Sequence, residues 1–182
     1  MDIFDQKMVL ESFTILRDSR EQDTERARRR YAAMGVPCER ATLSYGDYTY
    51  NAILPDGKPL HDLTGTINPL CAVERKMNLD ELAQCFTRGR DRFQREFERA
   101  AEHGCRVYLI IENGSWEHLL TGKYRSKLNP DAFKGSLDAW MVRYNANVIF
   151  CKEETTGERI RSILFRDLKE RLEQGEFDDE RN

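Results

Sequence analysis

The sequence lacks long hydrophobic runs. No apolar stretch reaches the roughly 18 residues that a membrane-spanning helix needs. The first residues, MDIFDQKMVLESF, carry acids in place of the basic segment and apolar core of a secretory signal. We therefore expect no membrane association and a cytoplasmic protein.

The sequence also lacks the cysteine and histidine spacings of disulfide frameworks and zinc sites. Each of the five cysteines lies in or beside an apolar segment, which is typical of buried thiols in a reducing compartment. The three histidines do not supply the usual spacing of zinc ligands. No two cysteines form a CxxC pair, and they stand at Cys38, Cys71, Cys85, Cys105 and Cys151.

Net positive charge and a glycine-rich phosphate loop are absent as well. The formal net charge is −3, which argues against a protein that coats nucleic acid nonspecifically. Without a glycine-rich loop, nucleotide-dependent phosphotransfer is not indicated. The charges are nevertheless unevenly distributed, because basic clusters occur at 26–30, 88–99 and 123–127.

What is present is an ordinary globular composition on a chain of 182 residues, 40% hydrophobic and 34% charged, which suits one domain. The order of predicted elements indicates an α/β fold with a mixed central sheet flanked by helices. Hydrophobic patterning predicts strands at 13–16, 39–43, 48–54, 71–74, 106–112 and 146–151. It predicts helices at 24–34, 79–100 with a break near Gly89, 116–120, 130–144 and 156–173.

The remaining segments read as irregular structure within a single domain, residues 1–182. Residues 1–12 look like a loose N-terminal lead-in, and residues 51–69 look like an inserted hairpin or loop. Residues 175–182 read as a disordered acidic tail.

Acids and a lysine gather at the ends of predicted strands. Residues two apart on a strand share a face, so Glu74 and Lys76 should point the same way and Arg75 the opposite way. Carboxylates favour hard cations such as Mg²⁺, and a nearby lysine can stabilise a charged transition state. The pattern is compatible with metal-dependent hydrolysis of a phosphodiester. The strand-end acids are Asp18, Glu21, Asp47 and Glu74.

Three runs, LRDSRE, LSYGDY and VERKMNLD, resemble the nuclease domain of XPF-type structure-specific endonucleases. The signature of that family is GD, a variable gap, then ERK, three residues and D. Here it reads Gly46-Asp47, then 74–76, then Asp80. The resemblance extends through RFQREFER and VYLIIE to the segment 126–150 and covers most of the chain.

The resemblance implies a restriction-endonuclease-like fold of the PD-(D/E)XK kind and DNA cleavage that depends on Mg²⁺ or Mn²⁺. The substrates implied are branched DNA, flaps or junctions, in DNA repair or recombination, and a nucleoid association follows for a bacterial or phage source. The implied metal ligands are Asp18, Asp47 and Glu74, and Lys76 is the implied catalytic lysine. The implied supporting residues of the active site are Glu21, Arg75 and Asp80, with Arg75 bonded to the backbone or to Asp80.

Two basic segments are candidates for DNA contact. The first is a stripe at steps of three and four, which either holds phosphates or forms a solvated face paired with nearby glutamates. Its members are Arg88, Arg92, Arg95 and Arg99. The second is the loop with Lys123, Arg125 and Lys127. The cluster at 26–30 reads as a solvated helix face, and both tryptophans read as core residues.

Two functions remain open on the sequence. The first is an active endonuclease, which the presence of all the acids and the lysine favours. The alternative is a catalytically inactive module of the same fold that binds DNA or protein. Family members often pair through this domain, so a homodimer is plausible. The helix-hairpin-helix module that many members append is not encoded in the 182 residues, so a second copy or a protein partner is expected to supply extra DNA binding.

Overall fold

A seven-stranded mixed sheet runs through the middle of the molecule, in a computed structural model that describes residues 1–178. Its strands are β1 (Thr14–Asp18), β2 (Cys38–Leu43), β3 (Tyr48–Asn51), β4 (Thr66–Ile67), β5 (Cys71–Lys76), β6 (Arg106–Glu112) and β7 (Asn147–Cys151). The strand order is β4-β2-β1-β3-β5-β6-β7. β3 runs antiparallel to both of its neighbours, and the other pairs are parallel. The expected mixed sheet is confirmed.

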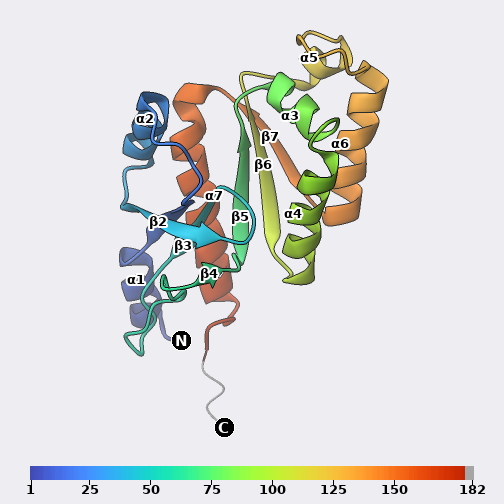
Figure 1. Ribbon diagram of the computed structural model, residues 1–182. Coiled ribbons are helices and arrows are strands. Elements are labelled where there is room, and N and C mark those ends of the chain that lie inside the picture. The colour runs from blue at the N-terminus through green and yellow to red at the C-terminus, as the bar shows by residue number, and fades with distance from the viewer. Residues whose placement is uncertain (179–182) are drawn as a thin grey trace.

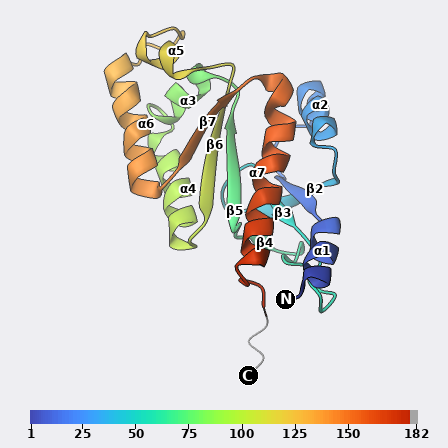
Figure 2. The ribbon, with the colours of Figure 1, turned by 180° about the vertical axis from the view of Figure 1, so that it is seen from behind.

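Helices cover both faces of the sheet. They are α1 (Ile3–Glu11), α2 (Glu25–Met34), α3 (Leu79–Cys85), α4 (Arg90–Glu102), α5 (Trp116–Leu120), α6 (Pro130–Tyr144) and α7 (Glu153–Glu173). Figures 1 and 2 show α1, α2 and α7 on one side of the strands and α3, α4 and α6 on the other. No helix within residues 1–178 is both long and apolar enough to cross a membrane.

Strand direction brings three of the predicted site residues to one edge of the sheet. β1 and β5 both run antiparallel to β3, so they end at the edge where β3 begins. Asp18 is the last residue of β1, Lys76 is the last of β5, and Asp47 immediately precedes β3. Residues that are distant in the sequence therefore meet at this edge.

The two faces of the sheet have separate hydrophobic cores. Leu109 and Ile111 of β6 point into the core under α3, α4 and α6, which also contains Trp140. Ile110 points the other way, into the core under α1 and α7, together with Leu164. The apolar side chains of α7 thus belong to the core. Trp140 is fully buried in this core, and Trp116 is partly buried against it, with its ring next to Phe150. Both tryptophans therefore pack with the core, as predicted.

Helix boundaries follow the local signals in the sequence. Thr24 caps α2 through its side chain, and Gly35 ends it in the left-handed conformation. The long helix predicted at 79–100 is interrupted as expected, because residues 86–89 form a turn and α4 starts after Gly89. α7 begins three residues earlier than predicted, because Thr156 donates to the carbonyl of Lys152 inside the first turn.

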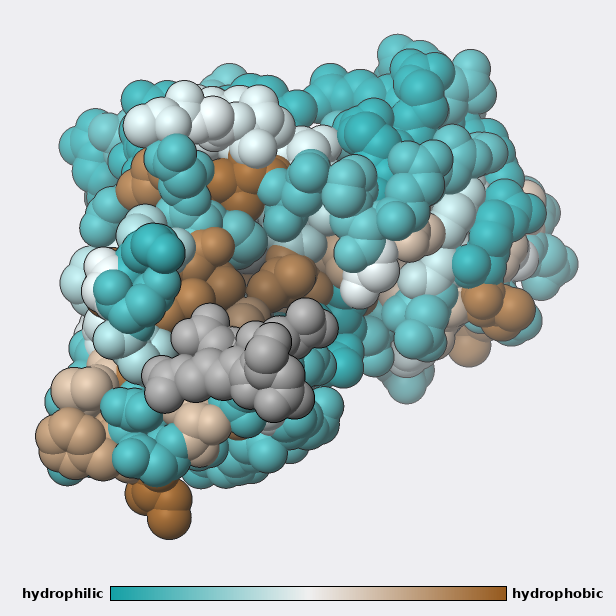
Figure 3. Space-filling model, turned by 90° about the horizontal axis from the view of Figure 1, so that it is seen from below, coloured by the Kyte–Doolittle hydropathy of each residue, from teal (hydrophilic) through white to brown (hydrophobic). Residues whose placement is uncertain are grey.

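The expectation of a loose N-terminal lead-in at 1–12 is wrong. These residues form α1, which is capped by the Asp2 side chain and contacts α7. Its only fully buried side chain is Val9, whereas Ile3 and Phe4 are exposed. Seen from below, hydrophobic residues lie scattered among hydrophilic ones on this end of the molecule (Figure 3). The helix therefore lacks the one-sided apolar pattern that reveals a helix in a sequence.

The insertion and the tail agree with expectation in part. Residues 51–69 are mostly irregular, held by a bridge between Ile53 and Pro59 and by the short β4. In the tail predicted to be disordered, residues 175–177 belong to the turn that follows α7, and the carboxylate of Asp178 pairs with the amino group of Met1. The rest of that tail, residues 179–182, lies outside the described residues.

α2 and α7 cross very closely. Gly157 of α7 is buried, and a Cβ built on it would lie 2.4 Å from the carbonyl oxygen of Arg30 and 2.9 Å from the Cβ of Ala33. Only glycine permits this approach between the two helices.

Candidate active site

A polar cleft of about 550 Å³ opens at the edge where β1 and β5 end. Its walls come from this edge of the sheet, from α3 and α4, and from the turn between those helices. It is lined by Asp18, Arg20, Glu21, Gly46, Asp47, Glu74, Lys76, Glu81, Gln84, Cys85, Arg88, Gly89, Arg92, Phe93 and Glu96. Five of the seven predicted catalytic residues therefore line one cavity.

Glu74 and Lys76 share the face of β5 that lines the cleft, as their spacing predicts. Both are buried, and the Lys76 ammonium donates to Glu74 Oε1 and lies 5.2 Å from the centre of the Phe93 ring. Burial acts to lower the pKa of Lys76, but the charges of Glu74 and Asp47 outweigh it and raise this pKa above its ordinary value. Lys76 is therefore protonated throughout the neutral range and acts as a fixed positive charge.

Asp47 is placed by the turn before β3. Gly46 has a φ of +75°, and a Cβ there would lie 2.8 Å from the Cβ of Ala72, so the turn requires glycine. Asp47 Oδ2 accepts from the backbone N–H of Arg75 at 2.7 Å. Burial and the negative charge of Glu74 raise the pKa of Asp47 well above its usual range, although Lys76 and the Arg75 amide act in the opposite direction. The two carboxylates are thus close enough to repel each other.

Asp18 is buried and fully engaged. Its Oδ1 accepts from the backbone N–H and the Nε of Arg20, both at 2.7 Å. Its Oδ2 accepts from Arg20 Nη2 at 2.9 Å and from the N–H of Leu43 at 3.1 Å. The Arg20 side chain itself is half exposed at the cleft. A cation already neutralises this carboxylate.

Glu21 connects the cleft to the opposite face of the sheet. Its Oε1 accepts from Arg30 Nη2 at 2.7 Å and from the hydroxyl of Tyr48 at 3.0 Å. The same oxygen lies 3.6 Å from Arg75 Nη2. Arg75 points away from Glu74, as predicted. The expected bond of its side chain to the backbone or to Asp80 is wrong, because its partners are Glu21 and Glu112.

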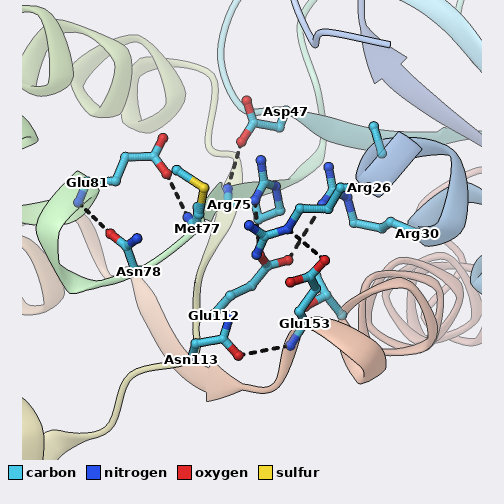
Figure 4. Close-up of polar contacts among 12 residues, drawn as sticks. Arg26, Arg30, Asp47, Arg75, Met77, Asn78, Glu81, Glu112, Asn113 and Glu153 are labelled. Carbon is cyan, nitrogen blue, oxygen red and sulfur yellow. Dashed lines mark hydrogen bonds and ion pairs between the residues drawn. The ribbon is translucent and has the colours of Figure 1, made fainter. Parts of the chain in front are cut away.

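The partner of Arg75 is Glu112, the last residue of β6. Glu112 Oε2 accepts from Arg75 Nη1 at 3.2 Å and from Arg26 Nη2 at 2.7 Å, and its Oε1 lies 3.6 Å from Arg30 Nη1. Arg26 also pairs with Glu153 at 2.8 Å. Figure 4 shows the arginines of α2 and β5 converging on Glu112, with Glu153 of α7 beside Arg26. Since Arg30 is buried and Arg26 is paired, the solvated face expected at 26–30 is wrong for both, although residues 28 and 29 are exposed.

The donor set of the cleft fits a hard cation in part. Within residues 1–178, no three or more His, Cys, Asp or Glu side chains are arranged to hold a metal ion. Two carboxylates do converge, since Asp47 and Glu74 line the same cleft and the charge of Glu74 raises the pKa of Asp47. A divalent cation would relieve this repulsion, and Mg²⁺ is commonly held by one or two carboxylates together with water and phosphate oxygens. Asp18 can join only by leaving Arg20.

Comparison with known protein families settles the family. A model of the ERCC4 domain matches residues 17–162, which is well over half of the chain. The chain belongs to the ERCC4 domain family. Proteins of this family are nucleases of a metal-dependent type. A comparison with curated proteins gives no match.

Solved structures similar to this ERCC4 domain include XPF from Aeropyrum pernix. One structure of that protein has a TM-score of 0.58 and 20% sequence identity, with 90% of this chain and 71% of the other covered. A second, of the same protein in complex with DNA, has a TM-score of 0.59 and 20% identity, covering 87% of this chain and 66% of the other. This likeness confirms the mixed sheet flanked by helices that was expected for an XPF-type nuclease domain.

The structure places the last residue of the ERCC4 signature outside the cleft. Asp80 lies in the first turn of α3, and its Oδ1 accepts from the backbone N–H groups of Arg125 and Ser126, each at 2.7 Å. It does not line the cavity that holds the other acids. Asp80 was expected to support the active site, but it does not line the cleft directly.

The predicted basic stripe divides into two parts. Arg88 and Arg92 line the cleft, and Arg92 Nε also lies 3.4 Å from Glu96 Oε1. Arg99 instead donates to the carbonyl of Ser44 at 3.0 Å, and Arg95 is exposed on α4. Pairing with a glutamate is seen at Arg92, whereas phosphate contact by Arg88 and Arg92 stays a prediction. In the loop, the side chains of residues 123, 125 and 127 are exposed.

Two site residues were missed in the sequence. Arg20 stands two residues after Asp18, close enough to have been read as its partner. Glu112 closes the buried strand VYLIIE, so the rule that selected Asp18 and Glu74, an acid at a strand end, also applies to it. The sequence therefore contained a pattern that could have identified both Arg20 and Glu112.

Proposed function

We propose that this ERCC4 domain is a metal-dependent endodeoxyribonuclease that hydrolyses phosphodiester bonds at branched, flap or junction DNA. One observation carries the proposal: Asp47, Glu74 and Lys76 converge in a single polar cleft at one edge of the sheet. Two carboxylates and a fixed ammonium are the groups that phosphodiester hydrolysis with a hard cation requires.

Asp47 and Glu74 would hold Mg²⁺ or Mn²⁺, with Asp18 as the further ligand that the resemblance to XPF-type nucleases implies. A bound ion of this kind lowers the pKa of a water and polarises a phosphate. The repulsion by Glu74 that raises the pKa of Asp47 would be relieved by such a cation, so both carboxylates would serve as ionised ligands.

Lys76 stabilises charge and does not act as a base. Its raised pKa keeps it protonated, and its ammonium is fixed between Glu74 and the Phe93 ring. A fixed positive charge in a buried position stabilises the negative charge that develops on the phosphate in the transition state. Arg88 and Arg92, on the rim of the same cleft, would hold neighbouring phosphates of the strand.

The choice of DNA as substrate rests on the family and on the similar structure of Aeropyrum pernix XPF, which was solved in complex with DNA. The basic residues on α4 and in the loop after α5 supply contacts to phosphate without reading sequence. A preference for branched DNA agrees with this kind of recognition, which depends on the shape of the backbone.

The test is cleavage of labelled flap, fork, junction, duplex and single-stranded DNA with Mg²⁺, Mn²⁺ or EDTA. We expect cutting of branched substrates only with metal, and a loss of about 10²-fold or more in rate for Asp47→Asn and for Lys76→Gln. Asp131→Asn is the matched control, because Asp131 is an exposed aspartate in the first turn of α6.

Each other outcome has a definite meaning. Binding of branched DNA without cleavage by any folded preparation would support the inactive binding module, which the engagement of Asp18 by Arg20 favours. Cleavage that persists in EDTA, or in both variants, would contradict the assignment of this cleft as the active site.

A further inference from the structure

Residues 123–128, between α5 and α6, alternate in exposure, and we call them the basic loop. Its outward side chains, all exposed and all cationic, are Lys123, Arg125 and Lys127. Its inward side chains, all partly buried, are Tyr124, Ser126 and Leu128. The segment is not a strand, so no sheet pairing accounts for this alternation.

The inward residues fix the basic loop to the protein. The Tyr124 ring packs edge-on against Phe133 of α6, with ring centres 5.3 Å apart. Its hydroxyl donates to the carbonyl of Leu128 at 2.8 Å, and Ser126 Oγ accepts from the N–H of Leu128 at 3.2 Å. The loop is therefore preformed before any ligand binds.

Asp80 ties the basic loop to the wall of the cleft. Its Oδ1 alone accepts from two consecutive loop amides, those of Arg125 and Ser126. The next residue of α3, Glu81, lines the cleft. Figure 1 places the segment between α5 and α6 at the same end of the molecule as α3. One carboxylate thus sets the position of the cations relative to the cleft.

The three cations have no acidic partner within residues 1–178. Lys123, Arg125 and Lys127 form no ion pair there, whereas Arg92 on α4 is paired with Glu96. Holding three like charges side by side on a fixed backbone is unfavourable unless a polyanion neutralises them. Such a set of preformed cations favours phosphate backbone, because each contact releases a counterion at little cost in ordering.

We propose that Asp80 is a positioning residue for DNA, and that it acts through the basic loop without taking part in the reaction. The inference rests on the proposed nuclease function for the identity of the polyanion. Asp80 holds the loop so that its three cations grip the phosphate backbone of a DNA arm beyond the cleft. This assigns the final aspartate of the signature to substrate binding.

The first test measures DNA binding in EDTA by anisotropy of a labelled fork, as a function of salt. Replacing all three loop cations by Gln should weaken binding more than tenfold and reduce the slope of log Kd against log salt by about 2 to 3, at about 0.9 per lost phosphate contact. The matched control, R28Q/R29Q/R166Q, removes three exposed cations elsewhere. An equal effect of the two triple variants would overturn the proposal.

The second test separates positioning from catalysis. Asp80→Ala should weaken binding of the fork about tenfold, leave kcat at saturating DNA within twofold, and speed hydrogen exchange at the amides of Arg125 and Ser126. Asp80→Asn keeps an acceptor oxygen but no charge, so it should restore most of the binding. A loss of kcat in Asp80→Asn with unchanged Kd would show that Asp80 is catalytic and would overturn the proposal.

The binding and hydrogen-exchange readouts are independent of cleavage. If the wild-type protein binds the fork without cutting it, the nuclease function fails and the binding tests still decide the role of Asp80. If only an acidic protein surface competes for the loop and DNA does not, the proposal fails while the cleft can still be active on DNA.

Discussion

The proposed metal ligand Asp47 lowers the free energy of unfolding when it is ionised. Burial and the charge of Glu74 raise its pKa in the folded protein, so the folded state binds the proton more tightly than the unfolded chain does. Its stabilising contribution is therefore present below the ordinary pKa of an aspartate, 3.8, and is lost as the pH rises through the folded pKa. Above that folded pKa, the ionised Asp47 destabilises the fold.

Asp47→Asn should consequently be more stable than the wild type in metal-free buffer at pH 7. We expect a gain of about 1 kcal/mol or more in the free energy of unfolding, since a tenfold change in proton affinity corresponds to about 1.4 kcal/mol. Urea unfolding at pH 7 and at pH 4 measures it, and the gain should shrink at the lower pH. A variant that is less stable than the wild type at pH 7 would show that this carboxylate is well accommodated.

The residues of the site differ in how readily the sequence reveals them. Glu74 and Lys76 could be predicted, because a two-residue step on a strand fixes a shared face. The contact of Asp80 with Arg125 spans 45 positions and uses backbone N–H groups, which leave no trace in residue type. Partners of that kind are fixed by tertiary structure alone.

At the scale of elements, Glu112 of β6 links this strand to α2 and to β5 through ion pairs. It is fully buried at the end of β6 and contacts Arg26 and Arg30 of α2 and Arg75 of β5. Because the N–H of Arg75 binds Asp47, this network also supports the cleft from the opposite face of the sheet.

Glu112→Gln should therefore destabilise the protein by about 3 kcal/mol or more, because breaking a buried ion network leaves unpaired charges behind. Glu117→Gln, an exposed glutamate on α5, is the control and should change stability little. Chemical denaturation of both variants gives the comparison. A cost below about 1 kcal/mol would mean that water or rearranged side chains take over the role of Glu112.

Most elements could be predicted from the sequence, and the exceptions have physical reasons. The strand VYLIIE and the break at Gly89 were read correctly, because continuous burial and a helix-breaking glycine are local signals. α1 was missed because Ile3 and Phe4 face solvent and only Val9 is fully buried. Its stability comes from contact with α7, which a sequence pattern does not show.

At the scale of the whole molecule, the two cores share the same strands. β6 contributes Leu109 and Ile111 to one core and Ile110 to the other, so neither core can be lost while the sheet remains. Both tryptophans lie on the α6 side, which makes their fluorescence a probe of one core alone. A single cooperative transition is expected.

Leu164→Ala, in the core under α7, tests this coupling. It should destabilise by about 2–5 kcal/mol and lower the urea midpoint equally by tryptophan fluorescence and by far-UV circular dichroism. Leu137→Ala, beside Trp140, is the matched variant in the other core and should behave in the same way. A fluorescence midpoint that Leu164→Ala leaves unchanged would show that the two sides unfold separately.

The close crossing of α2 and α7 bears on what a genetic screen would find. Any side chain at Gly157 pushes on the backbone of Arg30, whose guanidinium binds Glu21 on the cleft wall. Loss-of-function alleles should accordingly accumulate at this glycine, although it lies on the opposite side of the sheet from the cleft. A map of tolerated mutations would then show intolerant positions on both sides of the sheet. The residues that line the cleft would not by themselves account for the intolerance at Gly157.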